Sequence, residues 1–144
     1  MGGSVPCHCV TLRRAARSMT ALYDALLERA GLTLPQFSML RTLQRLGPQP
    51  MTRLAEEVRL DRTTLTRNLR PLRARKWIEI ASGADHRQRT VSLTRAGERA
   101  IARALPAWGR AQAAFEARLG GERLRLLREA LVELEAFSGE VPGP

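Results

Sequence analysis

The sequence is poor in aromatic residues, cysteine, histidine and lysine. Aromatic side chains make up 4% of the 144 residues, and the chain has only two cysteines, two histidines and one lysine. So few aromatics argue against a base-stacking platform for single-stranded nucleic acid. The sequence also lacks a Ser-His-Asp or paired-carboxylate arrangement and a glycine loop that would cradle a phosphate. We therefore predict that the chain is not an enzyme and needs no cofactor. With only two cysteines and two histidines, the sequence also disfavours a four-ligand zinc site, and we assign no metal ligands.

Long hydrophobic runs are also missing. No apolar run approaches the roughly 18 residues that a membrane span requires. The N-terminal residues lack the charged-then-apolar layout of a secretory signal, so we expect a cytoplasmic protein that does not enter a membrane. The hydrophobic fraction of 44% is ordinary for a globular chain and favours a folded domain over disorder.

Positive charge is abundant and unevenly placed. The formal net charge is +10, and residues 51–95 hold eleven Arg or Lys against five acids. Residues 96–144 hold seven of each and are neutral. A basic middle beside a neutral end suggests that one surface binds a polyanion and that the neutral end has a different role. Arginines spread over solvated surfaces would give a similar net charge in each segment.

The first third of the chain predicts two helices with clear ends. Apolar residues recur at three- and four-residue steps from about residue 10 to residue 30, where Gly31 can end the helix in a left-handed conformation. Thr33 and Gln36 form a capping-box pattern that starts a second helix, with Pro35 in its first turn. That helix is expected to end at Gly47, and the following residues 47–50 are interpreted as a loop.

A pair of short helices follows. Thr52 is expected to cap a helix through Val58, and Asp61 to cap another from residue 62 to about residue 75. In the second helix Leu65, Leu69 and Leu72 form an apolar stripe, and the opposite face carries arginine and threonine. Two short helices joined by such a turn are the helix-turn-helix arrangement.

Residues 77–80 and 89–93 then alternate in the manner of strands, with Ile78, Ile80, Val91 and Leu93 on the buried side. The polar segment between them is too long for a tight turn, so the pattern predicts a hairpin with an extended tip, or wing.

Two helices are expected to complete the chain. Thr94 can cap a long helix to about residue 119, kinked at Pro106, and a last helix runs from residue 122 to about residue 137. Their large apolar side chains are too many for so small a core. We therefore expect these helices to pack against a second copy of the chain.

The order of the predicted elements and several short sequence motifs resemble those of the multiple-antibiotic-resistance-regulator (MarR) family. The resemblance rests on residues 31–37, 54–56, 62–69, 85–89 and 93–97, and extends from about residue 10 to residue 137. It implies a mainly α fold, a winged helix-turn-helix of six helices with a two-stranded wing. The expected division is a tail at 1–9, a dimerisation region at 10–30 and 95–137, a DNA-binding domain at 33–94 and a tail at 138–144.

The same resemblance implies a homodimeric, sequence-specific double-stranded DNA-binding regulator, a repressor released from a pseudo-palindromic operator by a small ligand. A recognition helix needs hydrogen-bonding side chains opposite its packing stripe, and a wing arginine suits a narrow minor groove. We expect Arg67 to recognise guanine, Arg87 to enter the minor groove with Asp85 orienting it, and Arg89 and Arg95 to hold phosphates. The remaining expected contacts are Arg62, Thr63, Thr64, Thr66, Asn68 and Arg70.

Two residues depart from the family pattern. Pro71 lies inside the recognition helix and removes one backbone donor, which can bend the helix near Arg67. Lys76 stands where a glycine usually ends the recognition helix, so a strained lysine or a frayed turn is expected there.

Control of DNA binding has two candidate sites. The resemblance implies a pocket for a small aromatic or lipophilic acid, for which the sequence offers Tyr23, Phe37, Met39, Trp108 and Phe115. Cys7 and Cys9 precede the first helix and can be inert, a redox switch bridging two subunits, or part of a metal site. A thiol-sensing regulator of this fold and a non-specific architectural nucleic-acid-binding protein are the alternative functions.

Overall fold

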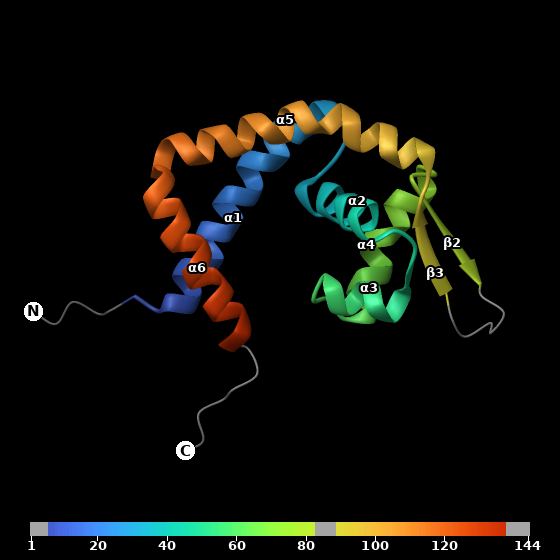
Figure 1. The fold of residues 1–144 in the computed structure, drawn as a ribbon, viewed down its shortest axis with the longest axis horizontal. Coiled ribbons are helices and arrows are strands. Elements are labelled where there is room, and N and C mark those ends of the chain that lie inside the picture. The colour runs from blue at the N-terminus through green and yellow to red at the C-terminus, as the bar shows by residue number, and fades with distance from the viewer. Residues whose placement is uncertain (1–5, 83–88, 138–144) are drawn as a thin grey trace, which may run out of the picture. The chain divides into compact units, whose positions relative to one another are not determined.

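The computed structural model describes residues 6–82 and 89–137. The chain forms two compact units that meet inside one helix, residues 1–108 and 109–144. In the described residues the order is α1 (His8–Leu27), a 3₁₀ turn (Glu28–Ala30), α2 (Leu34–Leu46), β1 (Gln49–Pro50), α3 (Met51–Glu57), α4 (Arg62–Ala74), β2 (Ile78–Ser82), β3 (Arg89–Leu93), α5 (Arg95–Leu119) and α6 (Gly121–Phe137) (Figure 1). Six helices and a small antiparallel sheet confirm the expected mainly α winged-helix class.

Several helix ends follow the capping signals in the sequence. Thr33 accepts a hydrogen bond from the Gln36 amide, and the Gln36 side chain accepts one from the Thr33 amide, completing the predicted capping box. Gly31 ends the 3₁₀ turn with φ of 71°, the left-handed conformation expected of it. Lys76, predicted to be strained, has φ of 57°. These ends are set by local chemistry, which explains why the sequence reveals them.

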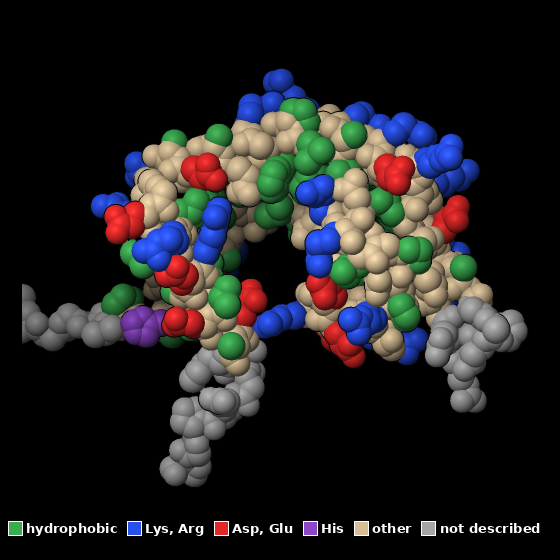
Figure 2. All heavy atoms as spheres, in the orientation of Figure 1, with side chains coloured by type: hydrophobic (Ala, Val, Ile, Leu, Met, Phe, Trp, Pro, Cys, Tyr) green, Lys and Arg blue, Asp and Glu red, His purple; other side chains and the backbone are tan. Residues whose placement is uncertain are grey.

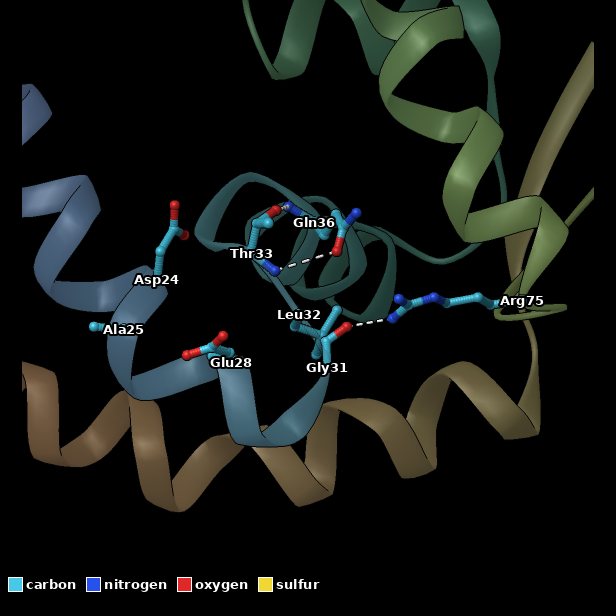
Figure 3. A pocket seen from close by; sticks show the side chains of 8 residues that line it. All are labelled: Asp24, Ala25, Glu28, Gly31, Leu32, Thr33, Gln36 and Arg75. Atoms are coloured by element: carbon cyan, nitrogen blue, oxygen red, sulfur yellow. Dashed lines mark hydrogen bonds between the residues drawn. The ribbon is translucent and has the colours of Figure 1, made fainter.

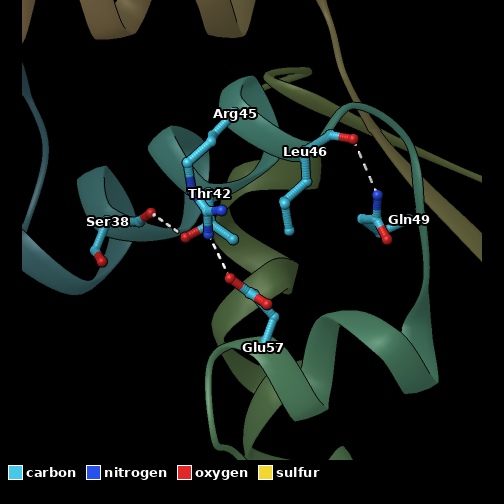
Figure 4. Close-up of polar contacts among 6 residues, drawn as sticks. All are labelled: Ser38, Thr42, Arg45, Leu46, Gln49 and Glu57. Carbon is cyan, nitrogen blue, oxygen red and sulfur yellow. Dashed lines mark hydrogen bonds and ion pairs between the residues drawn. The ribbon is translucent and has the colours of Figure 1, made fainter. Parts of the chain in front are cut away.

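The expected loop at residues 47–50 was wrong. Gln49 and Pro50 pair with Val91 and Thr90, so the sheet has three strands in the order β1-β3-β2 and not two. Proline fits this position because β1 is an edge strand, where a missing amide proton costs no ladder bond. The Gln49 side chain also donates to the Leu46 carbonyl at 3.0 Å, which closes the turn after α2 (Figure 4).

The helix cap expected at Thr52 was also wrong. α3 begins at Met51, and Pro50 occupies the N-cap position without a side-chain hydrogen bond. Proline is suited to a helix start because its φ is fixed near the helical value. α3 is joined to α2 by an ion pair between Arg45 and Glu57, which Figure 4 shows.

The wing strands lie close to their expected places. β2 runs over residues 78–82 and not 77–80, and its register pairs Ile78 with Leu93 and Ile80 with Val91. These four side chains therefore share one face of the sheet, as expected. Ile78 and Val91 are buried, while Ile80 and Leu93 are half-buried.

The core of the first unit is made by leucine and alanine. Its fully buried side chains include Leu27, Leu40, Leu43, Leu54, Leu65, Leu69, Leu72, Ile78, Val91 and Ile101. On the part of α5 that belongs to this unit, the buried side chains are Ala100, Ile101, Ala104 and Ala107, whereas Leu105 is 37% exposed. The packing stripe of α5 therefore consists largely of small residues, which allow a close approach.

The second unit contains the end of α5 and all of α6. An ion pair between Arg128 and Glu116 joins the two helices at 4.0 Å, and Arg125 pairs with Glu129 within α6. Gly120 has φ of 78° and separates α5 from α6. Among the described residues, no helix has the length and the apolar character needed to cross a membrane.

Candidate nucleic-acid interface

The α4 helix has one buried side and one exposed side. Leu65, Leu69 and Leu72 are fully buried. The opposite side forms a shallow surface groove lined by Arg62, Thr63, Thr66, Arg67 and Arg70. The structure therefore gathers five of the predicted DNA-contact residues on one solvent-facing surface, which we call the α4 face.

Hydrogen bonds at the start of α4 fix how this surface begins. Asp61 is the N-cap, and its carboxylate accepts bonds from the Thr64 amide at 2.9 Å and the Thr64 hydroxyl at 2.5 Å. The Thr64 hydroxyl bond and the amide bonds hold the pKa of the Asp61 carboxyl below its ordinary value. Thr64 is thus engaged in capping, and its predicted role toward DNA stays a prediction.

Four side chains of the α4 face are free to meet a ligand. Within the described part of the chain, Arg62, Thr63, Arg67 and Arg70 have no side-chain hydrogen bond, ion pair or ring contact. The Thr66 hydroxyl donates to the Arg62 carbonyl at 2.8 Å and keeps its lone pairs as acceptors. Arg67 can therefore present its donors to base edges or phosphates without first breaking an internal contact.

A second groove lies between α4 and the wing strands. Its volume is about 190 Å³, and it is lined by Met51, Arg62, Thr66, Leu69, Arg70, Arg73, Ile80 and Arg89. Four guanidinium groups surround a partly apolar floor, and no acidic residue lines it. This chemistry suits a phosphate backbone, because each arginine can donate to phosphate oxygens with its planar fork.

The groove brings together residues that are distant in sequence. Arg89, expected to hold a phosphate, comes from β3 and lines the same groove as Arg62 and Arg70 of α4. Arg73 also lines it, although the sequence reasoning did not select it. The sequence feature that could have identified Arg73 is its position three residues after Arg70, which places both side chains on the same side of the helix.

The remaining described contact residues line neither groove. Arg95 is exposed at the first position of α5, and Asn68 is half-buried on α4. In Figure 2, basic side chains also lie along the N-terminal half of α5. Asp85 and Arg87, expected at the wing tip, lie outside the described residues.

The two candidate control sites have different surroundings. Tyr23, Phe37 and Met39 are buried in the first unit, and the Phe37 and Trp108 rings lie 6.1 Å apart. Phe115 is half-buried in the second unit. Cys7 is the N-cap of α1 and Cys9 lies in its first turn; both thiols are exposed and free.

Comparison with known proteins agrees with this geometry. A family model described as MarR family matches residues 30–88. A helix-turn-helix transcriptional regulator of Bacillus cereus is 30% identical over 128 residues, covering 88% of this chain and 86% of the relative. The chain belongs to the MarR family of transcriptional regulators. Family membership places it among DNA-binding regulators and not among enzymes.

Two further relatives show the extent of the likeness. A Bacillus subtilis helix-turn-helix transcriptional regulator is 27% identical over 61% of this chain, and the match spans 64% of that protein. The crystal structure of the Mycobacterium tuberculosis transcriptional regulator MosR in complex with DNA is 36% identical. The structural match covers 93% of this chain and 99% of the MosR chain, with a TM-score of 0.80. The MarR-family fold therefore extends over nearly the whole chain.

Proposed function

We propose that this MarR-family chain acts in the bacterial cytoplasm as a homodimer and binds a pseudo-palindromic operator in double-stranded DNA as a repressor. The observation that carries the proposal is the α4 face, which lies opposite a fully buried leucine stripe and adjoins a groove with four arginines. A helix that is apolar on one side and donor-rich on the other has the chemistry needed in a major groove. The MosR structure, which has a similar fold and is in complex with DNA, supports DNA binding by this chain.

Six residues have a proposed task in DNA binding. Arg67 reads guanine through O6 and N7, because its guanidinium is exposed and free of internal partners. Arg62, Arg70 and Arg89 hold the phosphate backbone in the groove between α4 and the wing. The family resemblance implies that Arg87, oriented by Asp85, contacts the minor groove.

Dimerisation is proposed through the first and last helices. Exposed hydrophobic side chains lie on α1 (Val10, Leu12 and Leu22) and on α6 (Leu126, Leu131, Val132 and Leu134), and Figure 2 shows such side chains over α6. Covering them with a second copy would remove apolar surface from water. Two copies would present two recognition helices to half-sites about 34–36 Å apart, one turn of DNA.

The test is binding of labelled duplexes at several salt concentrations, with the operator found by footprinting upstream of the protein's own gene. We expect tight binding to one pseudo-palindrome and a slope of log affinity against log salt of several units, about −0.9 for each phosphate contacted. Arg67→Ala should relax preference for guanine at one position in each half-site, whereas Arg103→Ala on α5 should not. Equal affinity for every duplex would support the non-specific architectural alternative.

Release by a small ligand is the proposed mode of control. The Phe37 ring is buried and the Trp108 ring is half-buried in the first unit, with ring centroids 6.1 Å apart, and the small aromatic acid is proposed to bind beside them. Benzoate serves as the probe: it should lower operator affinity and change tryptophan fluorescence in the wild type, and Phe37→Leu should weaken both effects. An unchanged affinity across the benzoate titration would argue against an aromatic acid as effector.

A thiol switch is the second candidate, favoured by the exposure of both cysteines at the start of α1. Peroxide oxidises a thiolate to a sulfenic acid, and a second thiol then displaces water to form a disulfide. Peroxide should lower operator affinity in the wild type and leave the Cys7→Ser/Cys9→Ser double variant unaffected. The same response in both proteins would exclude the cysteines as sensors.

A further inference from the structure

Arg75 joins two segments that are far apart in the sequence. It is the C-cap of α4, and its guanidinium donates to the carbonyl of Gly31, 44 residues earlier (Figure 3). Gly31 lies in the left-handed turn before α2. Arg75 therefore connects the end of α4 to the corner between α1 and α2.

The same guanidinium also lies over an aromatic ring. Its central carbon is 4.7 Å from the centre of the Trp77 ring, a cation–π distance. Trp77 is only 9% exposed and directly precedes β2. The stacking removes much of the rotational freedom of the arginine, so that its donors stay directed at the Gly31 carbonyl.

Backbone hydrogen bonds end α4 at this same place. The Trp77 amide donates to the Leu72 carbonyl at 3.0 Å, and the Lys76 amide donates to the Arg73 carbonyl at 2.9 Å. This closing turn holds Lys76 in the left-handed conformation, which is unfavourable for any residue with a Cβ. A helix end with such a cost needs outside contacts to keep one geometry.

From these contacts we infer that Arg75 is a positioning residue for DNA recognition: by bonding the Gly31 carbonyl and stacking on Trp77, it fixes the direction of α4. The inference rests on the proposed function of the α4 face. Arg75 does not line either groove of the candidate interface, so it acts through α4 and not through a phosphate. It lines instead a separate cavity of about 430 Å³ with Asp24, Glu28 and Gln36 (Figure 3).

Three variants separate this role from a phosphate contact. Arg75→Met keeps the aliphatic stem over Trp77 and removes the donors and the charge. Arg75→Lys keeps one positive donor and should recover part of the lost function. Arg103→Ala, at an exposed position of α5, controls for the loss of one positive charge.

We expect Arg75→Met to weaken operator binding about five- to tenfold without changing the salt slope, because no counterion is released at a residue that contacts no phosphate. A phosphate-contacting arginine would instead lower the slope by about 0.9. Each affinity is calculated from the concentration of folded, active protein, so that a variant that merely contains less folded protein does not appear to bind more weakly. Unchanged affinity, or a slope reduced by about 0.9, would overturn the inference.

Hydrogen exchange of the free protein gives a measurement that does not depend on DNA. In Arg75→Met the amides of Lys76 and Trp77 should exchange faster than in wild type, because the closing turn opens more often. The α3 amides should be unaffected. Exchange equal to wild type would refute the positioning role, and a wild-type protein that binds no operator would refute the proposed function alone.

Discussion

Gly97 gives the sharpest test of how the winged helix-turn-helix joins α5. A Cβ at this position would lie 2.2 Å from the Trp77 carbonyl oxygen and 2.6 Å from Leu93 Cδ1. Real Cβ atoms essentially never come closer than 3.0 Å to such atoms. In Gly97→Ala, α5 must therefore move away from the backbone that follows α4.

The cost follows from the contacts at this junction. The Thr94 amide donates to the Trp77 carbonyl at 3.0 Å, and the Thr94 hydroxyl donates to the Lys76 carbonyl at 2.7 Å. Losing both bonds costs about 1–3 kcal/mol, and overpacking adds about 1–3 kcal/mol. Alanine gains about 1 kcal/mol over glycine in a helix. We therefore expect Gly97→Ala to lower the free energy of unfolding by about 3 kcal/mol.

The assay is urea and thermal unfolding followed by far-UV circular dichroism at one fixed protein concentration, since the stability of the proposed dimer would depend on concentration. Gly109→Ala is the matched control in the same helix. No atom lies within 4 Å of its added Cβ, so helix propensity alone predicts a gain of up to about 1 kcal/mol. Equal stabilisation by both alanines would show that the close approach at Gly97 is not present in solution.

Three other predictions concern the ends and the surface of α4. Lys76→Gly should stabilise the protein by about 0.5–1 kcal/mol, because glycine removes the left-handed strain, and urea unfolding will measure it; a loss of stability would refute the strain. Asp61→Asn should remove a part of the stability that depends on pH. Because the Asp61 pKa is lower in the folded chain than in the unfolded chain, the ionised carboxylate stabilises the fold above the unfolded pKa, and this contribution is lost as the pH falls through the folded pKa. The free energies of unfolding of wild type and variant, measured against pH, should therefore converge in acid. Arg73→Ala should lower the salt slope of operator binding by about 0.9, whereas Arg103→Ala should leave it unchanged.

Local signals allowed much of α4 and its surroundings to be predicted. Asp61 as a cap and the buried leucine stripe each depend on residues within one or two turns of α4. Such features follow from hydrogen bonding and helix periodicity, and neighbouring sequence is enough to reveal them. The division of α4 into a buried and an exposed side was predictable for the same reason.

The features that sequence did not reveal are long-range. β1 has only two residues, and its pairing with β3 depends on a strand about 40 residues later. The Arg75–Gly31 contact and the crowding at Gly97 likewise join segments that no periodic pattern relates. On α5 alanines form most of the buried stripe, because close packing selects for small side chains, and alanine marks a buried face less clearly in sequence than leucine does.

The contacts between the end of α4 and the start of α5 also constrain how DNA binding by this chain can be controlled. Thr94 accepts from the Gly97 amide at 3.1 Å while donating to Lys76, so one hydroxyl both caps α5 and holds the end of α4. Any displacement of α5 that opens this bond therefore also removes a restraint on the recognition helix. Thr94→Ser keeps the hydroxyl and should preserve operator affinity, whereas Thr94→Val keeps the shape and should weaken it with an unchanged salt slope. Equal affinity in the valine and serine variants would show that α4 is oriented without this bond.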